Sequence, residues 1–521
     1  MENEVLTLAK PKKSGLIHLI FSRFFVIVIL LAVQIAMVIT IYVKLYQYLP
    51  HFSLVLLLFL IGGVIYLFNC GMDNSARLTW MLIISMLPIS GVAILAFTQM
   101  NFGNRKIKER VQELIEGTMH ALKQPEGVLE KLAKDGSSTD DLDRYICRSG
   151  CFPVYEKTQT TFFPIGEEMF ASMLEELKKA EKFIFMEFFI IKEGYMWGSI
   201  LKILAEKAAQ GVDVRVMYDG MLEVSTLPPD YCKLLQKHGI KAKEFSPIRP
   251  LISSHYNYRD HRKILVIDGK VGYTGGVNLG DEYINREQRF GHWKDTGLML
   301  KGDAVKSFTL MFLQMWNIDE KEPQFEPWIS AGPQKEEASD GYVIPYCDCP
   351  LDGDKVGEMV YMDIFNRATQ YVHVMTPYLI LDGELETAIK YAAQRGLDVK
   401  LILPGIPDKT LAYSLAKAHY KRLVEAGVKI YEYTPGFVHA KIFTSDDCKA
   451  VVGTINLDYR SLYHHYECAA YLYQTSCIKD IEQDFQETLA KCREVTLETI
   501  KHEKLKYKIL GQLAQFIAPL M

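Results

Sequence analysis

The sequence predicts an α/β protein in which two similar halves follow an apolar N-terminal region. Strand-like apolar runs alternate with helix-like segments over most of the 521 residues, which is typical of sheets flanked by helices. A short motif of polar residues occurs twice with the same internal spacing, once in each half. Hydrophobic residues make up 49% of the chain, and the first hundred positions carry many of them. These observations predict a membrane region and two repeats.

Residues 1–104 contain three uncharged apolar runs, at 24–43, 52–68 and 78–97. The runs are 20, 17 and 20 residues long, and about 20 apolar residues span the hydrocarbon core of a bilayer. The first run is too long for a signal peptide, and no small-residue cleavage site follows it. We therefore expect this region to be embedded in the cell membrane as a multi-pass segment.

Basic residues flank the apolar runs on both sides. Lys10, Lys12 and Lys13 precede the first run, and a second basic group begins at Arg105 after the last. The positive-inside rule puts both flanks in the cytoplasm, which requires an even number of crossings. Three full spans would violate the rule. Either one run is re-entrant, the short second or the proline-broken third, or the rule does not hold here.

The composition limits the possible functions of the protein and the compartment that its catalytic domain faces. The net charge of −4 does not suit a protein that binds nucleic acid through bulk positive charge. The ten cysteines show no spacing typical of zinc ligands. Scattered thiols suit a reducing compartment, so we expect the catalytic domain to face the cytoplasm.

A linker, residues 105–160, separates the membrane region from the repeats at 161–330 and 331–521, the second of which includes a C-terminal tail. Within the linker, 106–132 is predicted to be a polar helix and 134–141 a loop.

Each half begins with an apolar strand, a helix and a second strand. The first half has FIFMEFF from residue 183 and KAAQGVDVRVMYDG from 207, and the second has VHVMTPY from 372 and YAAQRGLDVKLILPG from 391. Repetition of the whole unit predicts two halves related by an approximate twofold axis, whose polar motifs meet in one shared site.

The polar motif begins with a histidine and a lysine two positions apart. His261 and Lys263 therefore point to one face of a strand, and Asp268 follows where the strand turns. A glycine pair then makes a second turn whose backbone can approach a ligand closely, and Asn278 comes next.

The second copy of the motif consists of His439, Lys441, Asp446 and Asn456 at matching positions. A single histidine–lysine pair is rarely catalytic, whereas the complete spacing found twice indicates a functional site. A duplication that served only to bury a core would not require these polar residues to recur.

The two motifs resemble the HKD signature of the phospholipase D superfamily, and most of the chain is similar to bacterial cardiolipin synthases. In the first half the likeness lies in NYRDHRKILVIDG from 257, GGVNLGDEY from 275 and WKDTGLMLKGDAV from 293. In the second half it lies in TPYLILDGELETAI from 376, FVHAKIF from 437 and NLDYRSLYHHYE from 456. The run 78–97 is similar to the last membrane segment of that family, while the run 52–68 departs from its two-span pattern.

The resemblance implies two phospholipase D-like repeats, each a mostly β sheet flanked by helices, and a phosphatidyl transfer reaction. Two phosphatidylglycerol molecules would give cardiolipin and glycerol through a phosphohistidine, with no metal or other cofactor. The expected partners are phosphatidylglycerol and other membrane lipids, without nucleic acid. The alternatives are a phospholipase D-type hydrolase and another phosphatidyltransferase such as phosphatidylserine synthase. A non-catalytic membrane scaffold is disfavoured, because both motif copies are intact.

Roles follow from the same resemblance. His261 is expected to be the nucleophile and His439 the acid and base, a choice that comes from the family alone. The two lysines, Asn278 and Asn456 are expected to bind phosphoryl oxygens.

Four carboxylates complete the predicted site. A nucleophilic imidazole needs an acid that accepts its other N–H, and Asp295 and Glu467 are expected to orient the histidines. Asp268 and Asp446 are grouped with the catalytic residues as parts of the motif. As carboxylates at strand ends, they are expected mainly to fix turn amides or a neighbouring basic residue.

Two further segments leave alternatives open. Residues 248–260 hold an insertion of ten relative to the second half, which is either a headgroup-binding loop or a surface excursion. The tail 504–521 either lies on the membrane as an amphipathic segment or packs against the domain.

Overall fold

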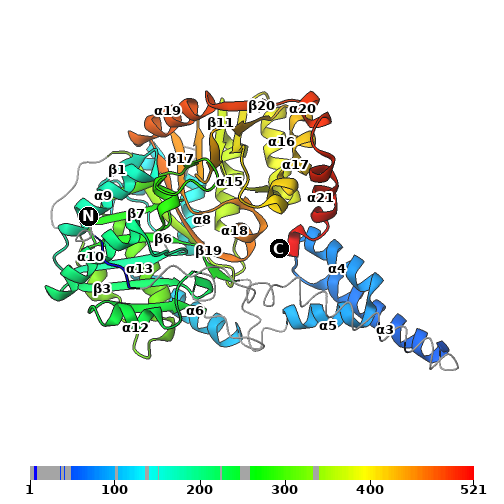
Figure 1. Cartoon of the computed structure of the whole chain (residues 1–521), viewed down its shortest axis with the longest axis horizontal. Coiled ribbons are helices and arrows are strands. Elements are labelled where there is room, and N and C mark those ends of the chain that lie inside the picture. Colours follow the sequence, from blue (N-terminus) through cyan, green and yellow to red (C-terminus); the bar gives the residue numbers. More distant parts are fainter. Residues whose placement is uncertain are drawn as a thin grey trace.

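The computed structural model places two large sheets side by side, with a helical N-terminal region that projects beside the C-terminus (Figure 1). It describes residues 5–8, 36, 40, 49–99, 104–134, 140–150, 152–222, 226–246, 258–332 and 340–520.

Within these residues the two repeats have the same strand order. The first sheet runs β1-β9-β7-β6-β2-β3-β4 and the second β10-β19-β17-β16-β11-β13-β14, with β20 added at its edge. The strands of the first sheet are β1 (Thr158–Phe163), β2 (Phe183–Phe188), β3 (Asp213–Asp219), β4 (Lys241–Phe245), β6 (Lys263–Ile267), β7 (Val271–Gly275) and β9 (Gly297–Gly302). Those of the second are β10 (Tyr342–Asp348), β11 (Tyr371–Met375), β13 (Asp398–Pro404), β14 (Lys429–Tyr433), β16 (Ile442–Ser445), β17 (Lys449–Gly453), β19 (His465–Tyr473) and β20 (Cys492–Val495).

Each repeat combines parallel and antiparallel pairing in the same way. β2 pairs parallel with β3 and antiparallel with β6, and β11 pairs in the same two ways with β13 and β16. A parallel neighbour requires a crossover, which α10 (Tyr195–Ala209) and α16 (Gly383–Gln394) provide. The central strands are covered on both faces, which explains why all of β2 is buried and why Glu187 is its only charged residue.

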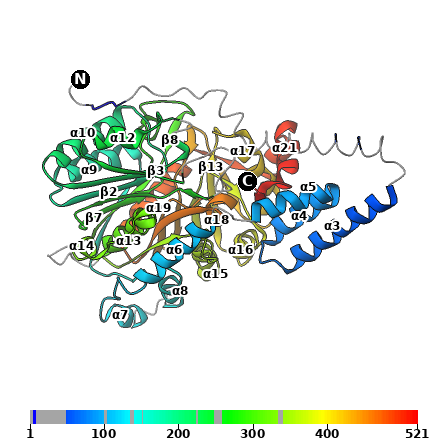
Figure 2. The same ribbon diagram turned by 90° about the horizontal axis from the view of Figure 1, so that it is seen from below.

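Helices cover both faces of the first sheet (Figure 2). α9 (Gly166–Lys178), α10 and α12 (Tyr231–Gln236) share a core with one face, to which Ile184 and Met186 of β2 contribute. The opposite face packs with α13 (Val305–Trp316) in a core that continues into the second repeat. The prediction of two α/β repeats is confirmed.

The remaining helices surround the second sheet or join the parts. They are α14 (Glu326–Ile329), α15 (Val356–Arg367), α17 (Thr410–Glu425), α18 (Tyr459–Tyr463), α19 (Cys477–Leu489), α20 (Leu497–Lys501), η2 (Asp281–Ile284), η3 (Asn317–Asp319) and η4 (Ala518–Leu520). Two short strands, β12 (Leu379–Ile380) and β18 (Leu457–Asp458), pair with each other.

Two short parallel pairings join the repeats. β5 (Arg259–Asp260) of the first repeat pairs with the start of β19 in the second. β15 (Gly436–Val438) of the second repeat pairs with β8 (His292–Lys294) in the first. Since β5 and β15 come directly before the two motif histidines, these pairings bring each histidine to the other repeat.

The N-terminal region contains α3 (Leu49–Asn69), α4 (Asn74–Met86) and α5 (Pro88–Gln99). The predicted span 24–43 lies outside the described residues, apart from two positions, and the run 52–68 falls in α3. Among the described residues, no helix is both long enough and apolar enough to cross a membrane.

The run 78–97 is two helices rather than one. Pro88 lacks the N–H that would continue α4, so the helix ends at Met86 and a second helix begins. α5 folds back on α4 so closely that a Cβ at Gly91 would lie 2.9 Å from the Cα of Ile84. An uninterrupted span over these residues is therefore wrong.

The linker also forms more helices than expected. The stretch 106–132 falls in α6 (Asn104–Thr118) and α7 (Val128–Lys134), and α8 (Asp140–Gly150) follows. Pro125 and the positive φ of Gly127 lie between the first two, which explains why one continuous helix does not form.

The C-terminal tail packs against the domain. α21 (Leu505–Gln515) lies on α17, and a Cβ at Gly511 would meet the carbonyl oxygen of Ser414 at 2.3 Å. Its other face exposes large apolar side chains, among them Leu505 and Leu513. Of the two alternatives for the tail, the structure thus shows packing against the domain.

Candidate active site

His261 lies where β5 joins β6, beside the second repeat. Its backbone N–H donates to the carbonyl of Tyr466 at 2.9 Å. Its Nδ1 lies 2.9 Å from both carboxylate oxygens of Glu467, which is fully buried on β19. The hydroxyl of Thr454 donates to the same carboxylate and fixes its position.

His439 has the matching arrangement in the opposite direction. Its backbone N–H donates to the carbonyl of Lys294 at 2.7 Å, and its Nδ1 lies 2.6 Å from Oδ2 of the buried Asp295. The glycine turn of the motif makes room here, because a Cβ at Gly276 would lie 1.9 Å from the Asp295 carboxylate. Each acid thus contacts the histidine of the other repeat, a pairing that the sequence did not reveal.

Both motif lysines are buried beside their histidines. Lys263 Nζ donates to the carbonyl of His261, and Lys441 Nζ donates to that of His439. Lys441 Nζ also lies 3.0 Å from His439 Nδ1. Burial lowers the pKa of Lys263 to about 8 and that of Lys441 to about 7.

The electrostatics of the histidines favour neutral rings. Burial lowers the pKa of His439 to about 4, with a further contribution from Lys441. Burial and Lys263 together lower the pKa of His261 well below its ordinary value. Both imidazoles are therefore neutral near pH 7, which leaves one ring nitrogen of each with a free lone pair.

The two carboxylates differ in their acidity. Burial alone would raise the pKa of Asp295, but His439 and Lys441 hold it below its ordinary value. Burial raises the pKa of Glu467 well above its ordinary value, against the opposing effect of Lys263. Asp295 is thus the stronger acid, and Glu467 the more basic partner for a histidine proton.

The two asparagines are buried near this cluster. Asn278 accepts from the N–H of Ile190 at 3.0 Å and donates to the hydroxyl of Tyr283, whose ring lies 5.5 Å from that of His439. Asn456 is buried, and its Oδ1 has no hydrogen-bond partner within the described residues.

Asp268 and Asp446 lie outside the cluster. Asp268 accepts from the backbone N–H groups of residues 181, 182 and 183, where β2 begins. Asp446 accepts from those of residues 369, 370 and 371, where β11 begins. The five residues of β6, roughly 16 Å of strand, lie between His261 and Asp268. The structure therefore does not bring them together with the histidines, and it shows the expected hydrogen bonds to backbone amides.

Sequence reasoning missed two aromatic neighbours of the histidines. The His465 ring lies 5.3 Å from that of His261, and the Trp293 ring lies 5.3 Å from that of His439. Both residues stand two positions before an orienting acid, in HHYE and HWKD. That shared position on a strand was the available signal, because residues two apart point to the same face.

One group of side chains has the composition of a metal site. Ligand atoms of His261, His465 and Glu467 lie within 4.8 Å of one another, and no other such group occurs among the described residues. Two imidazoles and a carboxylate suit zinc. The positive charges of Lys263 and Arg460 act on the same histidines and oppose a divalent cation there.

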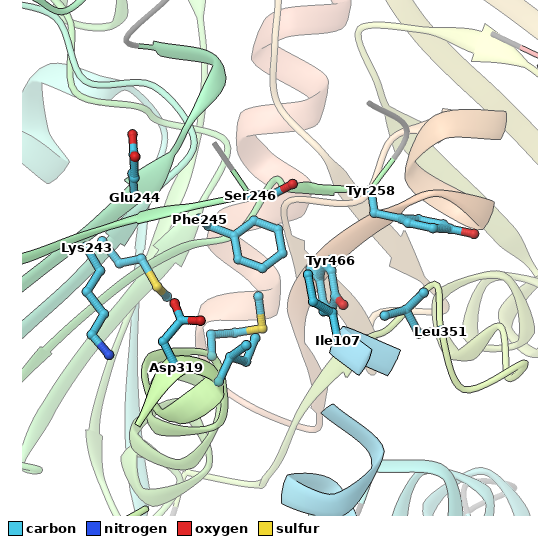
Figure 3. Close-up of a pocket in the computed structure, with 12 residues that line it drawn as sticks. Ile107, Lys243, Glu244, Phe245, Ser246, Tyr258, Asp319, Leu351 and Tyr466 are labelled. Atoms are coloured by element: carbon cyan, nitrogen blue, oxygen red, sulfur yellow. The ribbon is translucent and has the colours of Figure 1, made fainter. Parts of the chain in front are cut away.

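A separate cavity of about 100 Å³ lies on the other face of β19 (Figure 3). Phe245, Tyr258 and Tyr466 line it, together with Ile107 of α6. Since side chains alternate along a strand, Tyr466 points into this cavity while Glu467 points to the histidines. The cavity is therefore not the space between the two histidines.

Comparisons with known proteins agree with this geometry. A family model described as "Cardiolipin synthase, PLD-like domain" matches residues 173–316 and 361–489. An uncharacterized protein of Streptococcus mutans is 55% identical over 89% of this chain and its own full length. Cardiolipin synthase 2 of Bacillus anthracis is 33% identical, over 89% of this chain and 90% of its own.

A solved structure shows the same fold. Phosphatidylserine synthase of Haemophilus influenzae matches with a TM-score of 0.56 and 16% identity, over 74% of this chain and 98% of that one.

The matched carboxylates Asp268 and Asp446 allow a direct test of their structural role. Both have φ near +54°, a conformation that asparagine tolerates. Asp→Asn therefore keeps the backbone conformation and replaces one hydrogen-bond-accepting oxygen of the side chain with an NH₂ group. We expect Asp268→Asn to lower the free energy of unfolding by about 1–3 kcal/mol, because its amides are buried, and Asp446→Asn to cost less, because water reaches its amides. Denaturant unfolding measures the free energy of unfolding of each variant, and steady-state kinetics measures its kcat. A kcat loss of 100-fold in a variant that remains folded would contradict the structural role.

Proposed function

Because the chain belongs to the cardiolipin synthase family of phospholipase D-like phosphatidyltransferases, we propose that it joins two phosphatidylglycerol molecules into cardiolipin and releases glycerol. The observation that carries the proposal is the pair of buried histidines, each held by a carboxylate of the other repeat and accompanied by a lysine. Two such groups suit a reaction with two successive substitutions at one phosphorus atom.

In the first step, Nε2 of His261 attacks the phosphorus of one phosphatidylglycerol. The P–N bond forms as the P–O bond to glycerol breaks, and His439 donates a proton to the departing oxygen. Positive charge develops on His261, and the basic Glu467 carboxylate strengthens its hydrogen bond from Nδ1. The family assigns the nucleophile to the first histidine.

In the second step, the primary hydroxyl of another phosphatidylglycerol attacks the phosphohistidine. His439 removes the hydroxyl proton, the new P–O bond forms and the P–N bond to His261 breaks. The acid role of His439 in the first step requires a proton that its low pKa disfavours in the free enzyme. The negative charge of the bound phosphodiester offsets Lys441 and raises that pKa when substrate is present.

Lysines and asparagines complete the proposed site. Lys263 and Lys441 neutralise the two non-bridging phosphoryl oxygens, and burial strengthens this attraction. Asn278 and Asn456 supply hydrogen bonds to the same oxygens. The side chains of the chain itself provide every role in this scheme, so it contains no metal or other cofactor.

We further propose that residues 1–104 are embedded in the cell membrane and that the catalytic domain faces the cytoplasm. α3 exposes apolar side chains along its length, including Leu54, Leu58 and Phe68, which supports contact with lipid. An anchored site stays within reach of substrates that never leave the bilayer. The ten cysteines are scattered along the chain, which suits a reducing compartment.

The full-length protein in phosphatidylglycerol vesicles tests the proposal directly. We expect cardiolipin and glycerol in equal amounts, without added metal or nucleotide, when the products are resolved by mass spectrometry. Phosphatidic acid as the main product would mean that water is the acceptor and would identify a hydrolase.

The division of labour between the histidines predicts different defects. With phosphatidylglycerol, His261→Ala should abolish turnover, and His439→Ala should lower kcat by about 10²–10⁴-fold, the usual contribution of a general acid. With a phosphatidyl nitrophenol, whose leaving group needs no proton, His439→Ala should retain a burst of nitrophenol while His261→Ala gives none. Stopped-flow absorbance measures the burst. If His261→Ala gave a burst and His439→Ala gave none, His439 would be the nucleophile and His261 the general acid and base.

The pH dependence of kcat/KM should be bell-shaped with an unusually low alkaline limb. Activity rises from acidic pH as the Glu467–His261 pair loses the proton that burial retains on the acid. It falls as the pH passes about 7 to 8, because Lys441 and then Lys263 lose the charges that hold the phosphate. Lys441→Arg, measured relative to its own maximum, should move the alkaline limb upward. A wild-type limb near the pKa of an ordinary lysine would disprove this assignment.

A further inference from the structure

We propose that His465 is a third histidine of the site and donates a hydrogen bond from its ring to a phosphoryl oxygen of the bound lipid. This inference rests on the proposed function and adds a substrate-binding residue to it. No proton is transferred by His465 in this role.

The position of His465 places it beside the nucleophile. It lies on β19 two residues before Glu467, and its ring is 5.3 Å from that of His261 at an interplanar angle of 39°. His465 Nδ1 is 3.5 Å from Oε1 of Glu467, the same carboxylate that faces Nδ1 of His261. Since both rings turn Nδ1 to one acid, the Nε2 of each ring lies on the side away from that carboxylate.

His465 is also a buried polar group without a partner. Only 7% of it is exposed, and neither ring nitrogen has a hydrogen bond within the described residues. Buried imidazoles are normally paired, as His373 is with Glu482 and His419 with Glu386 in this chain. An imidazole beside His261 that lacks a hydrogen bond indicates that its hydrogen-bond partner arrives with the substrate.

The surrounding charge indicates that this partner is an anion. Burial, and then Arg460, His464 and Lys263, lower the pKa of His465 well below its ordinary value. The ring is thus neutral and keeps one N–H to donate. The same positive charges attract a phosphate and repel a divalent cation, so the phosphoryl group fits this place better than zinc does.

The corresponding position in the other repeat supports a donor. Trp293 stands two residues before Asp295, its ring lies 5.3 Å from that of His439, and its N–H is buried without a partner among the described residues. An indole N–H can only donate. Positions 293 and 465 therefore share a ring N–H. A phosphoryl group bound between His261 and His439 has oxygens that can accept hydrogen bonds from both.

Two substitutions at His465 separate hydrogen bonding from packing. His465→Gln keeps an N–H near the position of the ring edge, and His465→Phe keeps the aromatic volume without a donor. In the full-length protein with the phosphatidyl nitrophenol, we expect His465→Phe to lower the burst rate by about 10²-fold, the usual effect of removing one such donor, and His465→Gln to stay within about tenfold of wild type.

The matched control is His419, a buried histidine that is already bonded to Glu386 and lies outside the site. His419→Gln should leave the burst rate unchanged. Circular dichroism and thermal unfolding of every variant exclude general misfolding as the cause.

Three results would overturn the inference. A burst rate in His465→Phe equal to that of wild type would show that the ring contributes only packing. An equally large decrease of the burst rate in His465→Gln and in His465→Phe would lead to the same conclusion. Activity that a chelator removes and Zn²⁺ restores in wild type would mean that His465 is a metal ligand. Because the burst does not depend on the acceptor, it still tests His465 if wild type produces no cardiolipin and the proposed function fails.

Discussion

The exchange of short strands between the repeats is the constraint on which the site depends. β5 and β15 leave their own sheets and pair with β19 and β8 of the opposite repeat. The backbone N–H of each histidine is then fixed by a carbonyl of the other half. A histidine and its orienting acid consequently never come from the same repeat, so neither half can form a complete dyad alone. One hydrophobic core likewise spans both repeats and joins one face of the first sheet to the second sheet.

Such a site is costly to fold and is suited to a charged substrate. Two lysines, two carboxylates and three histidines lie within it almost without contact with water, and each charge carries a desolvation cost. Part of that cost is offset by hydrogen bonds from the lysines to the histidine carbonyls and by the carboxylates that face the rings. The lowered pKa values of both lysines show that this offset is incomplete in the free protein. In the proposed reaction a phosphodiester would supply the missing negative charge, so binding energy would be available at the reacting group.

Much of this could be predicted from the sequence because the duplication leaves regular signals. Strand and helix periods gave the two α/β halves, and the spacing of His261 and Lys263 gave the face they share. The partner of each acid could not be predicted, since Glu467 follows His439 in the chain but contacts His261 through a pairing between repeats. The apolar run 78–97 had the length of a span, and its reversal depends on Pro88 together with the close approach at Gly91. Tertiary packing decided both.

The two repeats share a strand order but differ in the side chains around their histidines, and the proposed two-step transfer would make use of this difference. In that proposal one histidine becomes covalently bound while the other exchanges protons with two alcohols, so identical surroundings would serve one of them poorly. The neighbours of His261 include a basic carboxylate and the imidazole of His465, which has no hydrogen-bond partner among the described residues. Those of His439 are a more acidic carboxylate, an indole and the ring of Tyr283. Within the shared strand order, the indole of Trp293 and the imidazole of His465 give the two histidines different surroundings.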